Sequence, residues 1–506
     1  MGSADTIQDV TIVGGGVSGL AAGSYLQMNG YRTHILERNA ACGGVSVSWK
    51  RGEYLFDGAT NWLAGCSPAV PEMHAVLREL IDFAKMRFFD FDEFIHIEMN
   101  GEVFRVYSDV DRLEAEMRRL APDDGKEIAR FTGAIRELSA AVIPFSEASD
   151  LLSGSERIAF PFKYWKAIRL YRKWSGISVE AYAERFQSPH LRSMFKMIYP
   201  NHAYFSVFSI ISVLSWMHRK AAGYPMGGSS GLIETLRARY LSLGGRVSER
   251  KAVSEILVKD HTANGVLCED HSRHESRLVV SAADMHHTVF SLLGGRYQGE
   301  KLERSFAEHP VYPSIIQVGI GVNRDLRNEP HKLLIPLDAP LQVGNETLSH
   351  LLLRICTYDP LFAPPGKTAL IGQLRTHDYD YWVSLRRDDR GRYEDDKRRV
   401  LRAIIDTLET RFGRIRENVE ATDVATPATY IRYTNVWKGS YQAFAPVPGS
   451  IGKQLCRTLP GLKNFYFAGQ WLSPAGGLPI GIVLGRQAAQ LICKREKRKF
   501  VTQKAS

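Results

Sequence analysis

Cysteine is scarce in this sequence, and the spacing of its cysteines argues against both a disulfide framework and a cysteine-ligated metal centre. Six cysteines occur among 506 residues, with no Cys-x-x-Cys pair and no metal-like spacing. They predict mostly buried, reduced thiols, no disulfide framework and no metal centre. No Ser/His/Asp order or paired-carboxylate motif stands out either. The isolated histidines are typical of structural positions; they are His202, His218, His286 and His287.

Long hydrophobic runs and nucleic-acid motifs are missing as well. The longest uncharged stretch covers residues 203–217, which is shorter than the roughly 20 residues that a membrane-spanning helix needs. It predicts a buried helix or a pocket wall. The net charge is +10, but no RNA- or DNA-binding motif accompanies it. We therefore expect no nucleic acid partner, and an anionic membrane surface is the better candidate.

A glycine-rich turn near the N-terminus is the most informative motif. Residues 9–20 read Asp-Val-Thr-Ile-Val-Gly-Gly-Gly-Val-Ser-Gly-Leu, which predicts a buried strand that turns directly into a helix. Gly14 permits the tight turn, Gly16 lets the backbone approach a pyrophosphate, and Gly19 lets the helix pack close to the strand. The free N–H groups of the helix N-terminus then point at phosphate.

A carboxylate follows at the distance that a dinucleotide-binding fold needs. Residues 32–36 predict the second strand, and Glu37 closes it roughly 20 residues after the glycines, where it can accept hydrogen bonds from ribose hydroxyls. An acidic residue here favours FAD or NAD over NADP. Because the first strand begins within the first dozen residues, we expect no cleaved signal peptide and a cytoplasmic location.

The chain is long enough for two or three domains, and its composition divides it into segments. The strand and glycine pattern occupies residues 1–80, resumes at 225–310 and returns at 455–506, which predicts a discontinuous Rossmann-like domain. Residues 81–224 are rich in helix formers and aromatics and predict a helical insertion. Residues 311–454 predict a substrate-binding domain. The expected fold class is α/β, with an inserted α+β substrate domain and the active site where the two meet.

Four segments spread over nearly the whole chain resemble one group of proteins. Residues 13–22, with Glu37-Arg38, Gly43-Gly44 and Phe56-Asp57-Gly58, are similar to the flavin amine oxidase superfamily. More narrowly, two segments resemble its phytoene desaturase, carotenoid isomerase and retinol saturase branch: Tyr-Pro-Met-Gly-Gly at 224–228 and Phe-Ala-Gly-Gln-Trp-Leu-Ser-Pro-Ala-Gly-Gly-Leu-Pro at 467–479. The resemblance implies that the Rossmann-like domain binds FAD and that the enzyme acts on long polyenes.

The resemblance also implies which residues hold FAD. Glu37 would bind the adenosine ribose, and Arg38 either covers the adenine or is a solvated surface arginine. A helix N-terminus at Gly477 would face the flavin's pyrimidine carbonyl and favour the negative charge of reduced flavin. The expected cofactor-binding set is Gly14, Gly16, Ser18, Gly19, Glu37, Arg38, Gly43, Gly44, Val45, Gly58, Val253, Gly469, Gln470, Gly477, Leu478, Pro479 and Ile480.

Few catalytic side chains are expected, because a flavin carries the hydrogen transfer. Gln470 and Trp471 follow the last strand and stand where amine-oxidising relatives have Thr-Glu. Val45 stands where many members have an arginine. A second group of aromatics either lines the substrate tunnel or packs in the core; it comprises Tyr433, Trp437, Tyr441 and Phe444.

Three functions follow from these residues and stay open at this point. The first is an FAD-dependent desaturase, saturase or isomerase of an apolar polyene, isoprenoid or other lipid-like substrate. The second is a flavin oxidase of an amine or another small substrate. The third is a non-catalytic prenyl-binding protein of the same fold, against which the complete phosphate loop argues.

A basic, aromatic segment suggests peripheral membrane association. Residues 160–174 interleave cations with aromatics at near-helical spacing, as an interfacial helix does, and residues 494–499 add further positive charge. An enzyme that acts on a water-insoluble polyene benefits from drawing it out of a bilayer. The alternative is a solvated basic helix that packs by its aromatic side.

Overall fold

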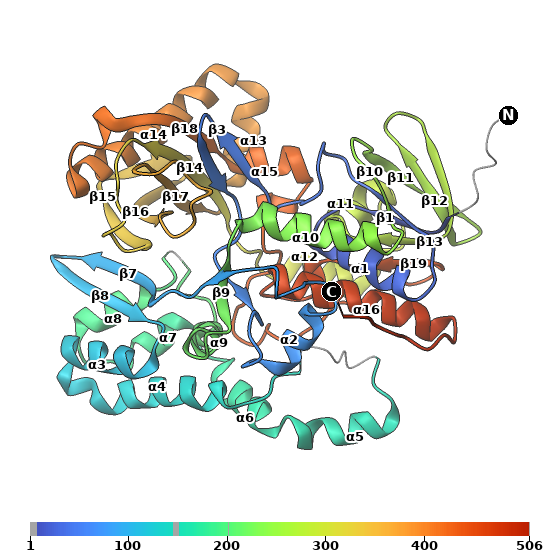
Figure 1. Cartoon of the computed structure of the whole chain (residues 1–506), viewed down its shortest axis with the longest axis horizontal. Helices are drawn as coiled ribbons and strands as arrows, with labels where there is room; N and C mark the ends of the chain where they lie inside the picture. Colours follow the sequence, from blue (N-terminus) through green and yellow to red (C-terminus); the bar gives the residue numbers. More distant parts are fainter. Residues whose placement is uncertain (1–7, 145–150, 201, 505–506) are drawn as a thin grey trace.

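Two seven-stranded sheets form the framework of the protein, and helices cover them (Figure 1). The structure is a computed structural model that describes residues 8–144, 151–200 and 202–504. The first sheet carries the glycine-rich turn. The second is built largely from residues 314–425, with one hairpin from much earlier in the chain. Together they match the expected α/β class with an inserted α+β unit.

The first sheet is parallel at its centre. β1 pairs with β2 on one side and β13 on the other, and β10 and β19 extend the parallel part. Its inner strands are nearly continuous apolar runs because helices cover both faces. The strands are β1 (Gln8–Val13), β2 (Thr33–Leu36), β10 (Arg246–Ser248), β11 (Val253–Lys259), β12 (Thr262–Cys268), β13 (Arg273–Ser281) and β19 (Phe465–Phe467).

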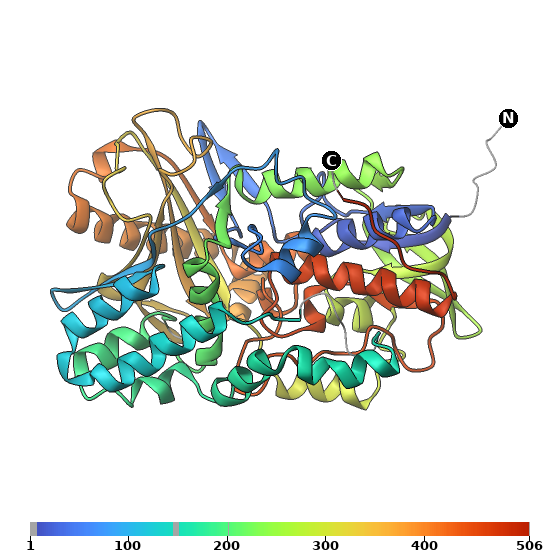
Figure 2. The same ribbon diagram turned by 60° about the horizontal axis from the view of Figure 1, so that its bottom comes forward.

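Two helices from opposite ends of the chain pack side by side on this sheet. Figure 2 shows α16 (Leu478–Arg495) running next to α1 (Val17–Met28). The contact is close because α16 has a glycine at the crossing: a Cβ on Gly485 would lie only 2.7 Å from the Ser18 carbonyl oxygen. This contact brings the N-termini of both helices to the same cleft.

The second sheet is antiparallel except where β15 meets β7. Its strand order is β18-β14-β17-β16-β15-β7-β8. The sequence is β-rich at residues 314–322, 348–357 and 368–375, which predicts three strands, and β14, β16 and β17 confirm them within a few residues. The strands are β7 (Glu93–Met99), β8 (Glu102–Tyr107), β14 (Ser314–Val322), β15 (Lys332–Val343), β16 (Glu346–Ile355), β17 (Thr368–Thr376) and β18 (Val419–Ala425).

The insertion at 81–224 is not helical throughout, contrary to expectation. Strands β7 and β8 form a hairpin whose turn is Asn100-Gly101, both with positive φ as a tight hairpin turn requires. This hairpin joins the second sheet through β15. An Asn-Gly pair between two alternating runs is a local sequence signal for such a hairpin.

The rest of the insertion is a helical layer that carries the uncharged stretch. The expectation for residues 203–217 is confirmed, because α9 (Val207–His218) is buried within this layer. The helices are α3 (Val110–Leu120), α4 (Gly125–Ser139), α5 (Gly154–Lys163), α6 (Trp165–Trp174), α7 (Val179–Ala183), α8 (Pro189–Lys196) and α9. None of the helices among the described residues is long and apolar enough to cross a bilayer.

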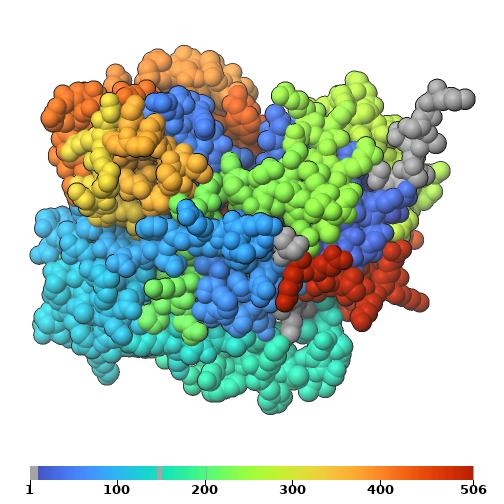
Figure 3. Space-filling view, in the orientation of Figure 1, coloured from blue at the N-terminus to red at the C-terminus, as the bar shows by residue number. Residues whose placement is uncertain are grey.

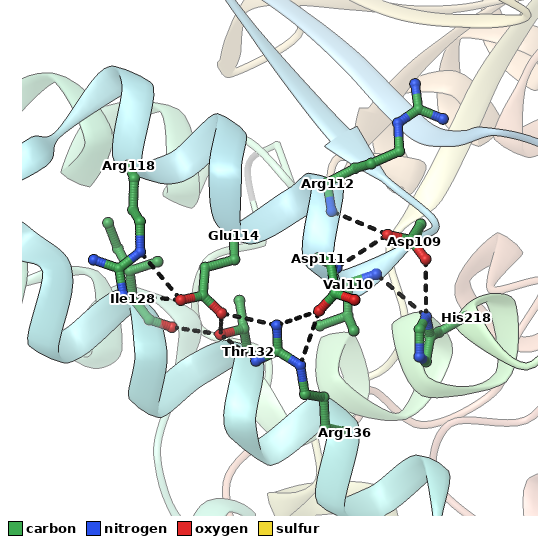
Figure 4. A network of polar contacts seen from close by, with 10 residues as sticks. All are labelled: Asp109, Val110, Asp111, Arg112, Glu114, Arg118, Ile128, Thr132, Arg136 and His218. Atoms are coloured by element: carbon green, nitrogen blue, oxygen red, sulfur yellow. Dashed lines mark hydrogen bonds and ion pairs between the residues drawn. The ribbon is translucent and has the colours of Figure 1, made fainter.

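A polar network holds α3 against α4 and α9 (Figure 4). The Glu114 carboxylate accepts hydrogen bonds from Arg118 at 2.8 Å and from Thr132 at 2.9 Å, and pairs with Arg136 at 2.9 Å. Burial opposes ionisation of this carboxyl, but these donors prevail and lower the pKa of Glu114 to about 2. The network fixes α3 and α4 to each other and to the C-terminal end of α9.

The remaining elements connect the two sheets or pack against one of them. The strands are β3 (Ser48–Arg51), β4 (Tyr54–Asp57), β5 (Leu63–Ala64), β6 (Phe88–Phe89) and β9 (Ala222–Pro225). The main helices are α2 (Pro71–Leu77), α10 (Gly228–Ser242), α11 (Met285–His287), α12 (Glu300–Glu308), α13 (Tyr379–Asp388), α14 (Arg390–Phe412) and α15 (Pro427–Thr434). All six cysteines are free, and all but Cys456 are buried.

Candidate active site

A large cavity runs between the two sheets. Its volume is about 910 Å³, and its wall includes the glycine-rich turn, the N-terminus of α16, helices α6 and α9, and strands of the second sheet. One part of it is therefore a nucleotide cleft, and the other part is enclosed by the insertion and the second sheet.

The glycine-rich turn has the geometry of a phosphate cradle. Gly14 has a φ of +97°, which favours glycine. A Cβ on Gly19 would lie 2.0 Å from the Gly14 carbonyl oxygen, so only glycine allows the helix this close to the strand. A Cβ on Gly16 would meet nothing nearer than the Gly43 carbonyl oxygen at 3.9 Å. Space is therefore left in front of Gly16, where the free N–H groups of α1 lie.

The residues expected around adenosine gather at one end of the cleft. Glu37 is 3% exposed, and its carboxylate accepts hydrogen bonds from the Gly15 N–H at 2.9 Å and from Asn39. Arg38 lines the cleft, and its Nη1 is buried without a hydrogen-bond partner among the described residues. Val253 lines the same end.

The second glycine pair and the Asp57-Gly58 turn form the next part of the wall. Gly43, Gly44, Val45 and Gly58 all line the cavity. Asp57 is fully buried and accepts hydrogen bonds from the Ala59 and Thr60 N–H groups and from Ser229. It thereby ties this turn to the start of α10, a role that the sequence reasoning did not assign.

The C-terminal motif closes the cleft as expected. Residues 469–471 and 473–481 line the cavity, and α16 begins there at Leu478. Gln470 does not point freely into the space: it donates to the Tyr441 carbonyl at 2.8 Å and accepts from the Gly477 N–H at 3.2 Å. It thus holds the entry to α16 in place.

The four residues expected to be catalytic do not gather at one point; they are Gln470, Trp471, Tyr433 and Trp437. Trp471 lines the cavity and is 2% exposed, in ring contact with Trp437 at 5.7 Å and Phe444 at 5.0 Å. Trp437 and Phe444 are not among the lining residues and pack behind Trp471. Tyr433 lies at the adenosine end, where its carbonyl accepts from Asn39 at 3.0 Å.

The histidines that follow β13 pack around the aromatic cluster of Trp437, Phe444 and Trp471. His286 stacks on Trp437 at 4.6 Å, and burial lowers its pKa to about 4. The neighbouring Asp284 lines the cavity, caps α11, and accepts from the Trp437 N–H at 2.9 Å. Burial raises the pKa of Asp284 to about 6, against the pull of these donors.

The part of the cavity beyond the cleft is mostly apolar. Its wall includes Leu138 from α4, Ile168 and Tyr171 from α6, and Phe208 and Val213 from α9. Three polar side chains of the second sheet also reach it: Lys332, Gln373 and Arg375. The sequence analysis missed these three. The available signal was a charged residue within or at the end of an otherwise apolar strand.

The cleft fits FAD by its own chemistry. It presents the N-termini of α1 and α16, a cradle in front of Gly16, and the buried carboxylate of Glu37. Two buried polar atoms in the wall, Arg38 Nη1 and Ser46 Oγ, lack hydrogen-bond partners among the described residues. Such orphaned groups are costly to bury unless a ligand satisfies them.

Comparisons with known proteins agree with this cleft. The family model of flavin containing amine oxidoreductases matches residues 17–493. The lycopene-forming phytoene desaturase of Pseudescherichia vulneris is 22% identical over 514 residues, which cover 95% of this chain and 98% of the relative. The chloroplastic prolycopene isomerase of Arabidopsis thaliana is 22% identical over 467 residues, which cover 89% of this chain and 76% of the relative.

Solved structures share the fold at lower identity. An oxidoreductase from Methanosarcina mazei has a TM-score of 0.61 at 17% identity and covers 96% of this chain and 100% of its own. Cyclohexylamine oxidase from Brevibacterium oxydans IH-35A has a TM-score of 0.57 at 16% identity, and the match covers 97% of this chain and 100% of the oxidase chain. The family match covers residues 17–493, which is nearly the whole chain, so the chain belongs to the flavin containing amine oxidoreductase family and is an FAD-dependent oxidoreductase.

Proposed function

We propose that the chain desaturates, saturates or isomerises carbon–carbon bonds of an apolar polyene, isoprenoid or similar lipid. The observation that carries this proposal is the continuity of the FAD cleft with a large apolar cavity walled by α4, α6 and α9. Relatives named phytoene desaturase and prolycopene isomerase support the same substrate class.

The charges of the wall argue against a protonated amine as substrate. Among the described residues that line the cavity, the acidic ones are Glu37, Glu269 and Asp284. All three lie with the nucleotide-binding sheet or follow its strands. The substrate part of the wall carries Lys332 and Arg375 instead. An ammonium group would be repelled there and would find no carboxylate among the lining residues that the structure describes.

The side chains have positioning tasks, since bound FAD supplies the hydrogen-transfer chemistry that side chains lack. The N-terminus of α16 provides N–H groups and a positive helix end at the cleft. Gln470 holds that N-terminus to the Tyr441 segment. Trp471, supported by Trp437 and Phe444, forms a rigid dry wall beside the last strand. We propose that this wall excludes water and orients the polyene.

A product analysis tests the function. Oxidised holoenzyme is mixed anaerobically with phytoene in vesicles, and chemically reduced holoenzyme with prolycopene. We expect a change in double-bond number or geometry, detected by mass and by chromatography against isomer standards. Unchanged polyenes in both arms, together with peroxide release from cyclohexylamine in air, would favour the amine oxidase reading. A purified protein that binds prenyl lipid but retains no flavin would favour the binding-protein reading.

We also propose that α5 and α6 rest on an anionic membrane surface. Helix α5 has no buried residue, and Phe162 and Trp165 are 77% and 52% exposed. Lys166, Arg172 and Lys173 are exposed and form no ion pair among the described residues. These two helices form one edge of the molecule, in teal in Figure 3.

The position of these helices suits uptake from a bilayer. Phe160 of α5, and Ala167, Ile168 and Tyr171 of α6, also line the cavity. The same two helices therefore carry an exposed aromatic and cationic surface and part of the apolar wall. A lipid substrate that enters here would pass from the membrane to the cavity without crossing water. The mixture of exposed aromatics with cations is typical of interfacial helices.

A further inference from the structure

The floor of the apolar cavity is the inward face of the second sheet. In the strand register, Lys332 of β15 lies opposite Arg354 of β16, and Leu352 of β16 lies opposite Gln373 of β17. Arg375 follows two residues after Gln373, on the same face. Of these five residues, all but Arg354 line the main cavity; Arg354 lines a small adjoining pocket with Lys332.

The two cations on the floor have no counter-charge. Neither Lys332 nor Arg375 forms a salt bridge within the described part of the chain. The Nε and Nη1 atoms of Arg375 are buried without a hydrogen-bond partner among the described residues. Its guanidinium lies 5.9 Å from the centroid of the Tyr312 ring. The ionisable groups that interact with it electrostatically are the hydroxyls of tyrosines, not carboxylates. Buried donors of this kind are costly unless a ligand pairs with them.

Lys332 shows the cost of this arrangement. Its side chain is buried, with 8% of the residue exposed, and the ammonium lies 4.4 Å from the centroid of the Phe94 ring and 5.3 Å from that of Trp62. Burial, together with the nearby charges of Arg375 and Arg354, lowers the pKa of Lys332 to about 7. An anion in the cavity would relieve both effects.

The rest of the cavity defines what that anion is attached to. The helix side of the wall consists of apolar groups such as Ile198, Phe208 and Val213. The phosphates of FAD would have their own partners at the N-terminus of α1, which packs on the other sheet. A free inorganic anion would leave the apolar wall unfilled. The occupant therefore combines one anionic end with a long apolar chain.

We propose that the cavity binds a long-chain isoprenoid or polyunsaturated carboxylic acid, with its carboxylate on Arg375 and with Lys332 and Gln373 beside it. This inference rests on the proposed function and specifies the substrate class. Arg375 is the natural anchor, because a guanidinium with unpaired N–H groups matches a carboxylate in geometry. Gln373 is itself held by its neighbour, since its Nε2 donates to Gln317 Oε1 at 3.0 Å.

Equilibrium binding tests the anchor without turnover. Holoenzyme is titrated with a twenty-carbon isoprenoid acid, its methyl ester and its alcohol, and binding is read from quenching of the tryptophans that line the cavity. We expect the acid to bind at least tenfold more tightly than the ester. The Arg375→Gln variant should lose this preference while it retains ester affinity and flavin content. Lys259→Gln, an exposed site on β11, is the matched control.

The pH dependence gives an independent readout. The charged groups that face Lys332 are Arg354 and Arg375. The neighbouring His331, which stacks on the Phe91 ring, has a pKa well below its ordinary value and stays neutral. Acid binding should weaken as the pH rises above about 7, because free Lys332 loses its proton there. Lys332→Met should abolish this dependence.

Each outcome separates the anchor from the proposed function. Equal affinity of wild-type holoenzyme for acid and ester would overturn the anchor and leave the apolar substrate class standing. Failure of all three compounds to bind would overturn the proposed function as well. The wild-type comparison needs no variant, so a misfolded Arg375→Gln protein would not obscure the result.

Discussion

At the scale of single residues, Gly16 and Gly19 have opposite reasons to be glycine. The space in front of Gly16 is open and its φ is −74°, so valine fits the backbone but occupies the pyrophosphate position. We expect Gly16→Val to fold with an unchanged melting temperature as apoprotein and to lose FAD. Flavin absorbance after gel filtration measures the loss. Full flavin occupancy would contradict the assignment of this loop.

Gly19→Val serves as the contrasting variant. Its Cβ would lie 2.0 Å from the Gly14 carbonyl oxygen, so α1 must shift away from the strand. We expect it to reduce the free energy of unfolding of the apoprotein itself by about 1–3 kcal/mol or more, as is typical of overpacking. The melting temperature of the apoprotein should fall accordingly. The two positions, three residues apart, thus separate a cofactor effect from a packing effect.

The buried ammonium of Lys332 destabilises the folded protein, although we propose that it helps to bind the substrate. Its folded pKa, about 7, lies below the ordinary value of 10.5, so the cost of the buried ammonium is complete below pH 7 and fades as the pH rises toward 10.5. We expect Lys332→Met to stabilise the protein at pH 6 by roughly 1–4 kcal/mol. Urea unfolding at several pH values measures the gain. A gain that does not shrink above pH 7 would contradict this charge state.

At the scale of elements, the α3–α4 contact depends on one carboxylate. The folded pKa of Glu114 is about 2, so its contribution is complete above the ordinary value of 4.5 and is lost as the pH falls toward 2. We expect Glu114→Gln to cost about 1–3 kcal/mol at pH 7, because it weakens charge-assisted hydrogen bonds. The difference from wild type, measured by urea unfolding, should narrow below pH 4.5.

Glu300→Gln, on α12, is the matched control for the Glu114→Gln variant. Glu300 pairs with Arg304 at the same spacing of four residues, but both side chains are largely exposed. Exposed pairs contribute little. A Glu300 variant as destabilised as the Glu114 variant would show that burial of the network has no role.

Some elements were predictable from sequence and others were not. Residues 478–493 predict a helix and the apolar run at 314–322 predicts a strand, and both are confirmed as α16 and β14. The hairpin of β7 and β8 was missed although its Asn100-Gly101 turn is a local signal, whereas its pairing with β15, more than 220 residues away, could not be read from the sequence. Pairing over such a distance leaves no local pattern beyond the Asn-Gly turn.

At the scale of the whole molecule, the membrane proposal predicts a charge-dependent association. Holoenzyme should sediment with vesicles that contain anionic lipid, and less so as salt increases. Changing Lys166, Arg172 and Lys173 to Glu should reduce binding more than tenfold, since each cation near such a surface is worth roughly 1 kcal/mol. These three are better choices than Lys163 and Arg169, which pair with Glu72 and Glu137.

The control for this test lies on a different part of the surface. Lys259 and Arg273 are exposed on β11 and β13, and changing both to Glu alters the net charge without touching α5 or α6. Their variant should bind vesicles nearly as well as wild type. Equal loss in both variants would mean that net charge alone drives association, and no dependence on anionic lipid at low salt would overturn the proposal.

The sequence by itself determined the nucleotide half of this protein. Gly14, Gly16, Gly19 and Glu37 lie within one strand–turn–helix–strand unit, whose geometry follows from local backbone requirements. Only the tertiary structure decided the substrate half. Sheet register places Lys332 and Arg375, 43 positions apart in the chain, on one cavity floor, and folding places Tyr433 at the adenosine end. Charge and burial at such a floor arise from long-range strand pairing, which no local pattern of residues encodes.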